Sequence, residues 1–435
     1  MTLEISKKLI QQKKYKKAFD ILSELLKKKP NDFKANFHMG RIYYDLNILD
    51  KSMFFLKKSD KLQPNNPNII FNLALALQGM GKIEQAKDNY LKLISINSMD
   101  VKSYYGLFTL NIKNITDELY KSLESIIKIN KISFYEKSLI NFIFSKIEKE
   151  RNKLKEEINF LKIAHQKCYE ANLTYNNQSD HYYKNVISKH FNKIFFFNSI
   201  KELPNFNNQD HIFIVGLPRS GSSLVETIIT HNEPNITSVG EFHAINKSIL
   251  DQVGKDIYTE DFQFKIDEKK FQEDLLEKYD NVGIKIFLDK SLQNFFNIEI
   301  ILKFFPNAKF IHTYRNFNDA VIGIYQAMLP ELSWSHEIEN IKSYIKIYKK
   351  TIDYFKNKYP DKILDVELSK LSNQKKKEAQ KILEFCKINY NDNSLDFNKN
   401  EKLFSKTYSF LQVREQIAEY QDKKYQPYYY LLDKK

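Results

Sequence analysis

The stretch IVGLPRSGSSLVETII, residues 214–229, decides the fold of the second half of the chain. Gly216 and Gly221 have the four-residue gap of the phosphate-binding pattern G-x-x-x-x-G-K-[ST], and the apolar residues before Gly216 are typical of the strand that precedes such a loop. Ser222 stands where that pattern has its lysine, and a cation, Arg219, comes earlier instead. The stretch therefore predicts a backbone cradle for a phosphate ligand, and the missing lysine weighs against ATP or GTP.

Composition and charge narrow the class of protein. The chain has 435 residues, enough for two or three domains, and its 42% hydrophobic and 28% charged residues are typical of a folded globular protein. A net charge of +14 raises nucleic acid as a partner. The lysines, however, are scattered over helical faces instead of forming one stripe, so we expect no nucleic-acid partner.

Targeting and metal signals are missing from the sequence. The start MTLEISKKLIQQKKYKKAF has no apolar signal-peptide core, and no run of about 18 or more apolar residues follows. We therefore expect a cytoplasmic chain with no membrane partner. Two distant cysteines, Cys168 and Cys386, and dispersed histidines match no ligand spacing, which predicts no metal site.

The first third of the chain repeats itself with a period of 34 residues. Ala18, Ser52 and Ala86 fall in register, and Pro30 and Pro64 close successive units. Small residues at fixed places in each unit are what paired helices need to pack closely. This pattern resembles the tetratricopeptide repeat, although tryptophan is missing from all units.

The repeats predict an N-terminal α-solenoid over residues 1–200, a scaffold for binding partners. Its expected units are 1–32, 33–66 and 67–100. Apolar residues at three- and four-residue spacing continue through residues 101–200, which we interpret as further, degenerate helices. A helical linker bundle is the alternative for that part.

A second domain is expected over residues 208–432, where short β-branched or aromatic runs alternate with helical stretches. The expected strands are HIFIV (211–215), IKIFL (284–288), KFIHTY (309–314) and KILDV (362–366). Strands that alternate with helices predict an α/β domain with a mainly parallel sheet. In such sheets ligands bind beyond the carboxyl ends of the strands.

The residues after the strands fit that rule. Arg219, Lys290 and Arg315 each follow a predicted strand, so we expect three cations at one rim of the sheet. The backbone N–H groups of residues 220–223 begin a helix, and they form an anion cradle that the helix dipole strengthens.

Five segments in order resemble the sulfotransferases, specifically the branch in which tetratricopeptide repeats precede a domain similar to protein-tyrosine sulfotransferases. VGLPRSGSSLVETII resembles the 5′-phosphosulfate loop, and SVGEFH resembles the segment with the catalytic glutamate. LDKSLQNF is similar to the Asp-Lys motif, LKFFPNAKFIHTYRNFNDAVIGIYQ to the 3′-phosphate motif, and SFLQVREQI to the C-terminal loop that closes over the nucleotide.

The resemblance implies that the chain uses 3′-phosphoadenosine-5′-phosphosulfate (PAPS) as cosubstrate, without a metal. It also implies a P-loop-like fold and transfer to a hydroxyl, with a protein or peptide acceptor that the repeats recruit. The implied catalytic residues are Glu241, Lys290, Ser409 and Arg219. The implied nucleotide-binding residues are Arg219, Ser220, Gly221, Ser222, Ser223, Arg315, Gly323, Ser409 and Lys424.

Glu241 is the expected general base, because an acceptor such as tyrosine has a pKa near ~10 and must lose its proton as its oxygen attacks sulfur. The alternatives are that Glu241 only pairs with Arg219, or that His243 is the base. Lys290 would neutralise the leaving phosphate, and Asp289 would orient the Lys290 side chain. Glu226 is expected to face packing or water.

The chain departs from the family where Gly323 stands in place of a serine, which weakens the expected grip on the 3′-phosphate. Three hypotheses about the function remain open. The first is an active sulfotransferase with a tyrosine, carbohydrate or small-molecule hydroxyl acceptor. The second is an interaction scaffold whose transferase domain has lost activity, and the third is an ATP- or GTP-dependent enzyme.

Overall fold

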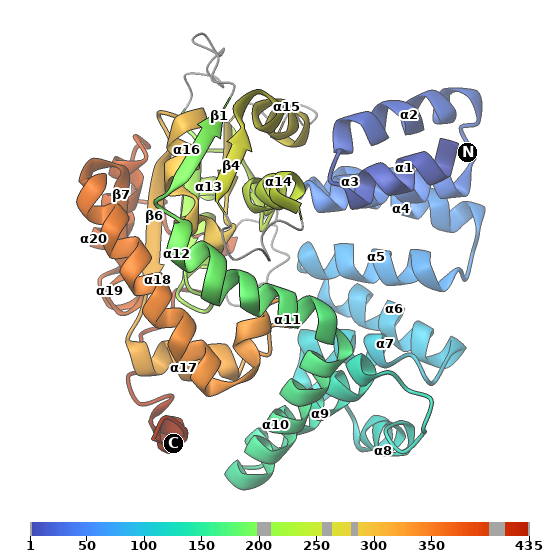
Figure 1. The fold of residues 1–435 in the computed structure, drawn as a ribbon. Helices are drawn as coiled ribbons and strands as arrows, with labels where there is room; N and C mark the ends of the chain where they lie inside the picture. The colour runs from blue at the N-terminus through green and yellow to red at the C-terminus, as the bar shows by residue number, and fades with distance from the viewer. Residues whose placement is uncertain (1, 198–209, 255–262, 280–285, 400–413, 434–435) are drawn as a thin grey trace.

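The structure is a computed structural model that describes residues 2–197, 210–254, 263–279, 286–399 and 414–433. Antiparallel helix pairs stack at the N-terminal side, and a parallel sheet with its helices forms the other side (Figure 1). The predicted class, an α-solenoid of repeats followed by an α/β domain, is confirmed.

The solenoid begins with three helix pairs that follow the 34-residue period. They are α1 (Thr2–Gln11) with α2 (Tyr15–Lys28), α3 (Phe33–Asp45) with α4 (Leu49–Leu62), and α5 (Pro67–Gly79) with α6 (Ile83–Ile96). Small residues let the helices of a pair approach closely. A Cβ on Gly40 would lie 2.7 Å from Leu56 Cγ, and the Ser52 hydroxyl donates to the Gly40 carbonyl at 2.8 Å. Ala18 and Ala86 are fully buried at the corresponding positions.

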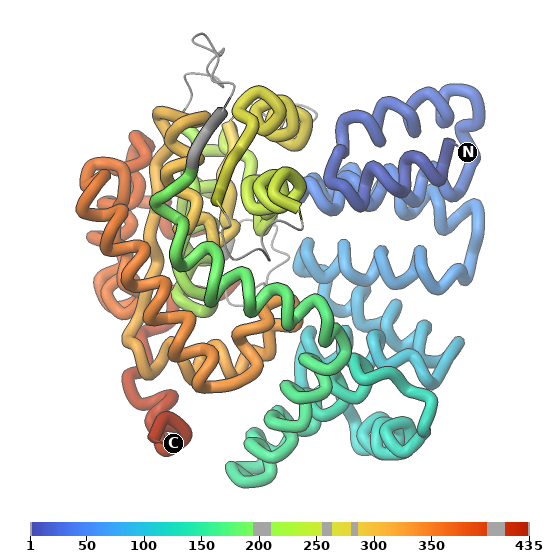
Figure 2. Tube along the Cα trace, viewed as in Figure 1, coloured from blue at the N-terminus to red at the C-terminus, as the bar shows by residue number. Residues whose placement is uncertain are grey.

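The turn inside each pair has one left-handed residue, and these residues also recur every 34 positions. They are Lys13 (φ 60°), Asn47 (φ 62°) and Gly81 (φ 75°). In the first turn, Lys13 N–H donates to Ile10 and the next N–H donates to Leu9, which is the Schellman ending of a helix. These turns point from the solenoid toward the α/β domain (Figure 2).

The helical region continues beyond the third pair. Its further helices are α7 (Val101–Leu110), α8 (Asp117–Ile126), α9 (Phe134–Glu150), α10 (Leu154–Ala171), α11 (Leu173–His181) and α12 (Ser188–His190). A capping box at Ser133 and Glu136 fixes the start of α9. Residues 194–197, expected as the end of the helical region, are instead a strand, β1 (Ile194–Phe197), which pairs in parallel with β4 (Phe264–Asp267).

The main sheet is parallel, with the strand order β3-β5-β2-β6-β7. Its strands are β2 (Ile212–Gly216), β3 (Ile236–Gly240), β5 (Ile286–Asp289), β6 (Lys309–Tyr314) and β7 (Ile363–Glu367). Four of the five match the predicted runs within two residues at each end. β3 was not predicted, because its sequence ITSVG is short and half polar.

Helices follow the strands and cover the sheet. They are α13 (Ser222–Asn232), α14 (Ala244–Val253), α15 (Glu268–Tyr279), α16 (Ile298–Phe304), α17 (Phe317–Tyr325), α18 (Ile338–Lys358), α19 (Leu368–Asn373) and α20 (Lys375–Phe385). A 3₁₀ turn over residues 292–296 precedes α16. The boundary proposed between residues 200 and 208 lies outside the described residues.

Candidate functional site

A cavity of about 630 Å³ opens at the carboxyl ends of the central strands. β2 is the central strand of the sheet, with β3 and β5 on one side of it and β6 and β7 on the other. After β2 the chain forms the two strands on one side and then crosses to form the two on the other. The strand order therefore reverses at β2, and open parallel sheets bind ligands at such a point. The loops after β2, β3 and β6 and the segment 415–425 all contribute to the lining.

The loop after β2 makes a sharp turn that suits glycine at two places. Gly216 has φ 140° and its Cβ would collide with the Thr313 carbonyl, and Gly221 has φ 88° with Leu368 Cδ1 2.8 Å from a Cβ there. Arg219 between them is also left-handed, at φ 63°. The backbone thus bends back on itself at the start of α13.

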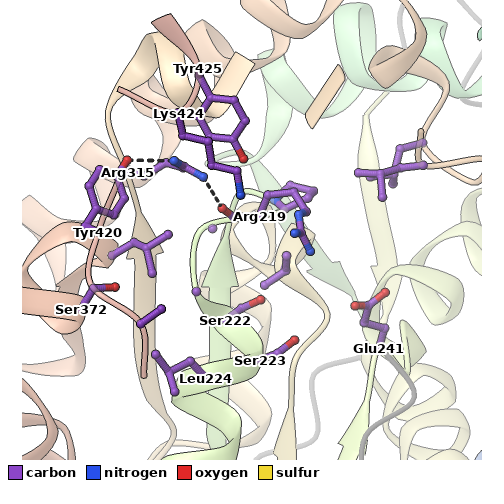
Figure 3. A pocket seen from close by; sticks show the side chains of 18 of the residues that line it. Arg219, Ser222, Ser223, Leu224, Glu241, Arg315, Ser372, Tyr420, Lys424 and Tyr425 are labelled. Carbon is purple, nitrogen blue, oxygen red and sulfur yellow. Dashed lines mark hydrogen bonds between the residues drawn. The ribbon is translucent and has the colours of Figure 1, made fainter. Parts of the chain in front are cut away.

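The N-terminus of α13 faces the cavity. Gly221 is its N-cap and supplies no side-chain oxygen, so serine side chains do not cap this helix. Amides in a first helical turn have no earlier helical carbonyl to bond, and the helix dipole makes that end positive. Ser222 and Ser223 line the cavity (Figure 3), and the buried Ser220 hydroxyl has no hydrogen-bond partner among the residues that the structure describes.

Arg315 follows β6 and reaches the same cradle. Its Nη1 donates to the Arg219 carbonyl at 3.1 Å, and its Nη2 donates to the Tyr420 hydroxyl at 2.8 Å (Figure 3). Nη2 also lies 3.3 Å from Asp319 Oδ2. Within the described part of the chain, the buried Nε atom of this guanidinium has no hydrogen-bond partner.

The C-terminal segment completes that side of the cavity. The Arg315 guanidinium lies 4.9 Å from the centre of the Tyr425 ring, and Lys424 lines the cavity beside it (Figure 3). Gly323, on α17, presents its Cα to the same place. A Cβ there would be 3.4 Å from the Tyr425 hydroxyl oxygen and 3.5 Å from Arg315 Nη1.

Glu241 lies on the opposite side of the cavity (Figure 3). Its Oε1 accepts a hydrogen bond from Lys290 Nζ at 2.8 Å, and the Lys290 side chain is only 1% exposed. Burial opposes the charge of Lys290, but the carboxylates of Glu241 and Glu226 outweigh that effect and raise the lysine pKa. Lys290 is therefore a buried cation held directly beneath Glu241.

Glu226 belongs to this group, contrary to the expectation that it faces packing or water. Its Oε2 lies 3.9 Å from Lys290 Nζ, and its other oxygen accepts a hydrogen bond from Ser238. Asp289 points elsewhere, because its two oxygens accept from the Tyr279 hydroxyl and from the Ser291 N–H. Through the Ser291 N–H, Asp289 fixes the backbone around Lys290.

The segment that carries Glu241 is held between two left-handed residues, Gly240 (φ 62°) and His243 (φ 54°). The Lys290 N–H donates to the Gly240 carbonyl at 2.9 Å, and the His243 N–H donates to the Ser291 hydroxyl at 2.7 Å. Burial lowers the pKa of His243, against the attraction of Glu241. His243 lines the cavity as well, so it stays a candidate for a neutral base.

The sulfotransferase family model matches residues 211–392, and the tetratricopeptide repeat model matches residues 33–66 and 67–98. Residues 211–392 are a sulfotransferase-family domain. Every loop that carries Arg219, Glu241, Lys290 or Arg315 lies inside the matched range. The cavity therefore lies mainly in the matched domain, closed on one side by residues 415–425 from beyond the match.

Two curated proteins share parts of the chain. An uncharacterised protein of Aquifex aeolicus is 23% identical over 381 residues, which cover 83% of this chain and 49% of that protein. A TPR repeat-containing protein of Methanocaldococcus jannaschii is 34% identical over 91 residues, or 19% of this chain and 28% of that protein. The chain thus spans about half the length of the first relative.

Solved structures of sulfotransferases are also similar. The sulfotransferase domain of the Synechococcus PCC 7002 olefin synthase has 17% identity and a TM-score of 0.36, covering 52% of this chain and 91% of that one. Sulfotransferase STF1 of Mycobacterium tuberculosis has 11% identity and a TM-score of 0.32, covering 70% and 98%. These scores are too low to carry residue roles across.

The sulfotransferase domain brings most of the predicted site residues together. Those that line the cavity are Arg219, Gly221, Ser222, Ser223, Glu241, Arg315 and Lys424. Lys290 and Gly323 lie behind lining residues, because Lys290 contacts Glu241 and Gly323 faces Arg315 and Tyr425. Ser220 is buried in the cradle loop. Ser409 lies outside the described residues, so its role stays a prediction.

Sequence reasoning missed the partners of Arg315. Asp319 could have been found from the sequence, since an arginine and an aspartate four residues apart at the start of a helix can form an ion pair. Tyr420 and Tyr425 had none, because they stand about a hundred residues away and the chain has 27 tyrosines. Their contacts depend on how the C-terminal segment crosses the cavity.

In the part of the chain that the structure describes, no cluster of metal-ligating side chains occurs. Across the same residues, no helix combines the length and the apolar character that crossing a bilayer requires.

Proposed function

We propose that the chain transfers a sulfuryl group from 3′-phosphoadenosine-5′-phosphosulfate to a hydroxyl group, with a tyrosine or similar phenol as the acceptor. The observation that carries this proposal is one cavity that joins an anion cradle to an ion-paired carboxylate. Arg219 and the amides that start α13 lie on one side, and Glu241 with Lys290 lies on the side that faces them. The sulfotransferase-family match covers both sides.

The residues present fit such a donor. Two buried donors at the cradle, Ser220 Oγ and Arg315 Nε, lack partners in the described part of the protein. Buried polar groups that lack partners are costly unless a ligand or water satisfies them. Leu224, Leu368 and Ile417 line the cavity beside the cradle and offer apolar surface to a purine ring. Donor binding without a metal agrees with a site built from cations and amides.

When bound, the donor supplies a sulfuryl group attached to its 5′-phosphate. Arg219 and the first-turn amides of α13 hold that phosphate, and Arg315 with Lys424 attracts the 3′-phosphate. Glu241 takes the proton of the acceptor hydroxyl as the new oxygen–sulfur bond forms. The electrons of the broken sulfur–oxygen bond leave with the phosphate, whose charge Lys290 stabilises.

Apolar residues in the cavity lining support a phenolic substrate. Leu292, Leu329 and Leu332 line the cavity together with Tyr135 and Trp334. An apolar and aromatic wall fits a flat ring better than a hydrated sugar. Tyr135 comes from α9, so the helical region contributes to the wall, which fits a protein or peptide acceptor that the repeats recruit.

The test of the donor is calorimetric titration with adenosine 3′,5′-diphosphate and with ATP, in the presence and absence of Mg²⁺. We expect the first nucleotide to bind without Mg²⁺ and far more tightly than ATP. Arg219→Ala should weaken its binding by about 10- to 100-fold, because a hydrogen bond to a charged group contributes about 1.5–3 kcal/mol. Arg151→Ala, at the end of α9 and outside the cavity lining, is the matched control.

Tighter, Mg²⁺-dependent binding of ATP would overturn the proposed donor. The acceptor is tested separately, by following transfer of a radiolabelled sulfuryl group from the donor to a tyrosine peptide, 2-naphthol and a monosaccharide. Transfer to the monosaccharide alone would overturn the phenolic acceptor and leave the donor assignment intact.

A further inference from the structure

The first repeat differs from the next two at its left-handed turn residue. Asn47 and Gly81 are residue types that tolerate a positive φ well, whereas Lys13 at the same position in the period carries a long side chain at φ 60°. A lysine there adopts a less favourable backbone conformation than its two counterparts. Unfavourable backbone conformations of this kind cluster at functional sites.

The Lys13 side chain contacts the segment that carries Glu241. Its Nζ donates to the Phe242 carbonyl oxygen at 2.9 Å, although 229 positions separate the two residues. The same ammonium lies 5.3 Å from the centre of the Phe242 ring, and Tyr15 stacks on that ring at 6.2 Å. The first repeat thus holds both the backbone and the side chain of Phe242.

This contact completes the support of the Glu241 backbone. On the side before Glu241, the sheet fixes the Gly240 carbonyl through the Lys290 N–H. On the side after it, the Ser291 hydroxyl accepts a hydrogen bond from the His243 N–H, and Lys13 donates one to the Phe242 carbonyl. Two of these anchors belong to the sulfotransferase domain, and Lys13 comes from the solenoid.

Several charges surround the Lys13 ammonium. Burial lowers its pKa, while the carboxylates of Asp45 on α3, Asp289 and Glu241 in the sulfotransferase domain, and Glu331 act in the opposite direction. Lys13 is therefore a desolvated donor surrounded by acidic groups. A neutral or shorter side chain at this position would remove the hydrogen bond to Phe242 and leave the acidic groups with less compensation.

We propose that Lys13 is a positioning residue, through which the first repeat of the solenoid holds the 240–243 segment so that Glu241 meets the acceptor hydroxyl. This rests on the proposed function for its catalytic consequence, but not for the contact itself. The solenoid is then part of the active site's support as well as a docking surface. Separating it from the sulfotransferase domain would loosen the general base.

The test compares Lys13→Asn with Lys14→Gln. The first variant installs the residue type of the second repeat, which suits the left-handed turn but is too short to reach Phe242. The second removes the neighbouring cation, whose Nζ pairs with Glu277 on α15 at 3.0 Å, and leaves the 240–243 segment untouched. Both variants thus remove one contact between the same turn and the sulfotransferase domain.

Hydrogen–deuterium exchange measures the positioning without any acceptor. In Lys13→Asn the amides of residues 241–244 should exchange at least about tenfold faster than in the parent chain, and in Lys14→Gln they should not. Unchanged exchange in Lys13→Asn would overturn the proposal. This readout holds even if the chain transfers no sulfuryl group, so the failure of the proposed function stays distinguishable.

The kinetic arm uses the PAPS donor with 2-naphthol as acceptor. Lys13→Asn should lower kcat about tenfold or more while the dissociation constant of adenosine 3′,5′-diphosphate stays unchanged, since the cradle is on the other side of the cavity. Lys13→Arg, which keeps a cationic donor, should recover most of the lost rate. A fall in nucleotide affinity that matches the fall in kcat would show general damage to the fold and overturn the positioning role.

Discussion

Lys290 and Glu241 form an ion pair between the ends of neighbouring strands, with 2.8 Å between Nζ and Oε1. The two ends of the pair differ in exposure, because the lysine side chain is 1% exposed and the glutamate side chain is 54% exposed. Removing the Glu241 carboxylate would leave the buried Lys290 ammonium with the more distant Glu226 carboxylate, 3.9 Å away, and weaker compensation of a buried charge is destabilising. Substitutions at Glu241 therefore need to keep an acceptor for the Lys290 ammonium.

Glu241→Gln meets that condition, because the amide oxygen can still accept the hydrogen bond from Lys290. We expect kcat to fall by ~10²-fold or more, since glutamine cannot take the acceptor proton, while the affinity for adenosine 3′,5′-diphosphate stays nearly unchanged. Steady-state kinetics with a phenol acceptor and nucleotide titration measure the two effects. His243→Ala is the comparison variant, because His243 is the other titratable group beside the segment.

If the rate survives in Glu241→Gln and falls in His243→Ala, the base is the histidine. That outcome has a physical basis in the structure, since burial lowers the pKa of His243 and keeps a neutral imidazole available. The two variants together assign the proton acceptor.

Lys146 on α9 gives a prediction about stability and pH. Burial, together with the positive charges of Lys149, Arg219 and Lys424, lowers the pKa of Lys146 to about 7, while Glu157 opposes the shift. Between pH 7 and the unfolded value of 10.5, the unfolded chain holds a proton that the folded chain has lost. Stability contributed by this group therefore rises with pH through that window.

Lys146→Met should flatten this rise by about 1–2 kcal/mol between pH 7 and pH 9, because one group changes the free energy of unfolding by at most about 1.4 kcal/mol per pH unit. Denaturant unfolding at the two pH values measures it. Lys155→Met, an exposed lysine on α10, is the control. Parallel pH profiles for the parent chain and Lys146→Met would contradict the prediction.

The sequence allowed the architecture to be predicted, because its periods are long and its strands are apolar. Ala18, Ser52 and Ala86 mark helix contacts that recur every 34 residues, and buried parallel strands such as Ile212–Gly216 are continuous apolar runs. Side chains that follow strand ends could also be assigned to one rim, since parallel strands end at the same edge. Arg219 and Arg315 meet there, with Nη1 of Arg315 on the Arg219 carbonyl.

Contacts between distant segments could not be predicted. Lys13 and Phe242 belong to different domains, and no local pattern states which turn of the solenoid faces the sheet. Tyr425 reaches Arg315 for the same kind of reason, since only the path of the C-terminal segment places it there. Such contacts follow from the packing of whole elements, whereas periodicity reports on each element alone.

Gly81 tests a second contact between the solenoid and the C-terminal segment. Arg414 Nη2 donates to the Gly79 carbonyl at 2.5 Å, and a Cβ on Gly81 would collide with the Arg414 side chain. A left-handed alanine costs roughly 1–2 kcal/mol. Gly81→Ala should destabilise the fold by more than this backbone cost, because the added Cβ must also displace Arg414. Asn47→Ala, at the same left-handed turn position of the second repeat (φ 62°), isolates that backbone cost.

Thermal unfolding of the two variants measures the difference. Equal destabilisation would mean that Arg414 moves aside without cost, and the contact between the third turn and the C-terminal segment would then contribute nothing to stability.

A substitution at Gly323 tests whether the glycine weakens nucleotide binding. Its Cβ would be 3.5 Å from Arg315 Nη1, an ordinary contact distance, so a serine fits without displacing its neighbours. The serine hydroxyl would add one donor beside the guanidinium, and a hydrogen bond to a charged phosphate oxygen contributes about 1.5–3 kcal/mol. Glycine inside a helix also costs roughly 0.5–1 kcal/mol relative to alanine. We therefore expect Gly323→Ser to bind adenosine 3′,5′-diphosphate several-fold more tightly or better, with no loss of stability.

The control is Gly323→Ala, which adds the Cβ and the helix propensity but no hydroxyl. Both variants should unfold at a temperature no lower than the parent chain, and only serine should tighten binding in calorimetric titration. The Tyr425 hydroxyl, 3.4 Å from the added Cβ, is the group that competes for this space. If serine leaves the affinity unchanged, that hydroxyl already serves the phosphate, and Tyr425→Phe should then weaken binding in the parent chain. If both substitutions leave the affinity unchanged, the 3′-phosphate is held elsewhere, and the assignment of this end of the cavity is wrong.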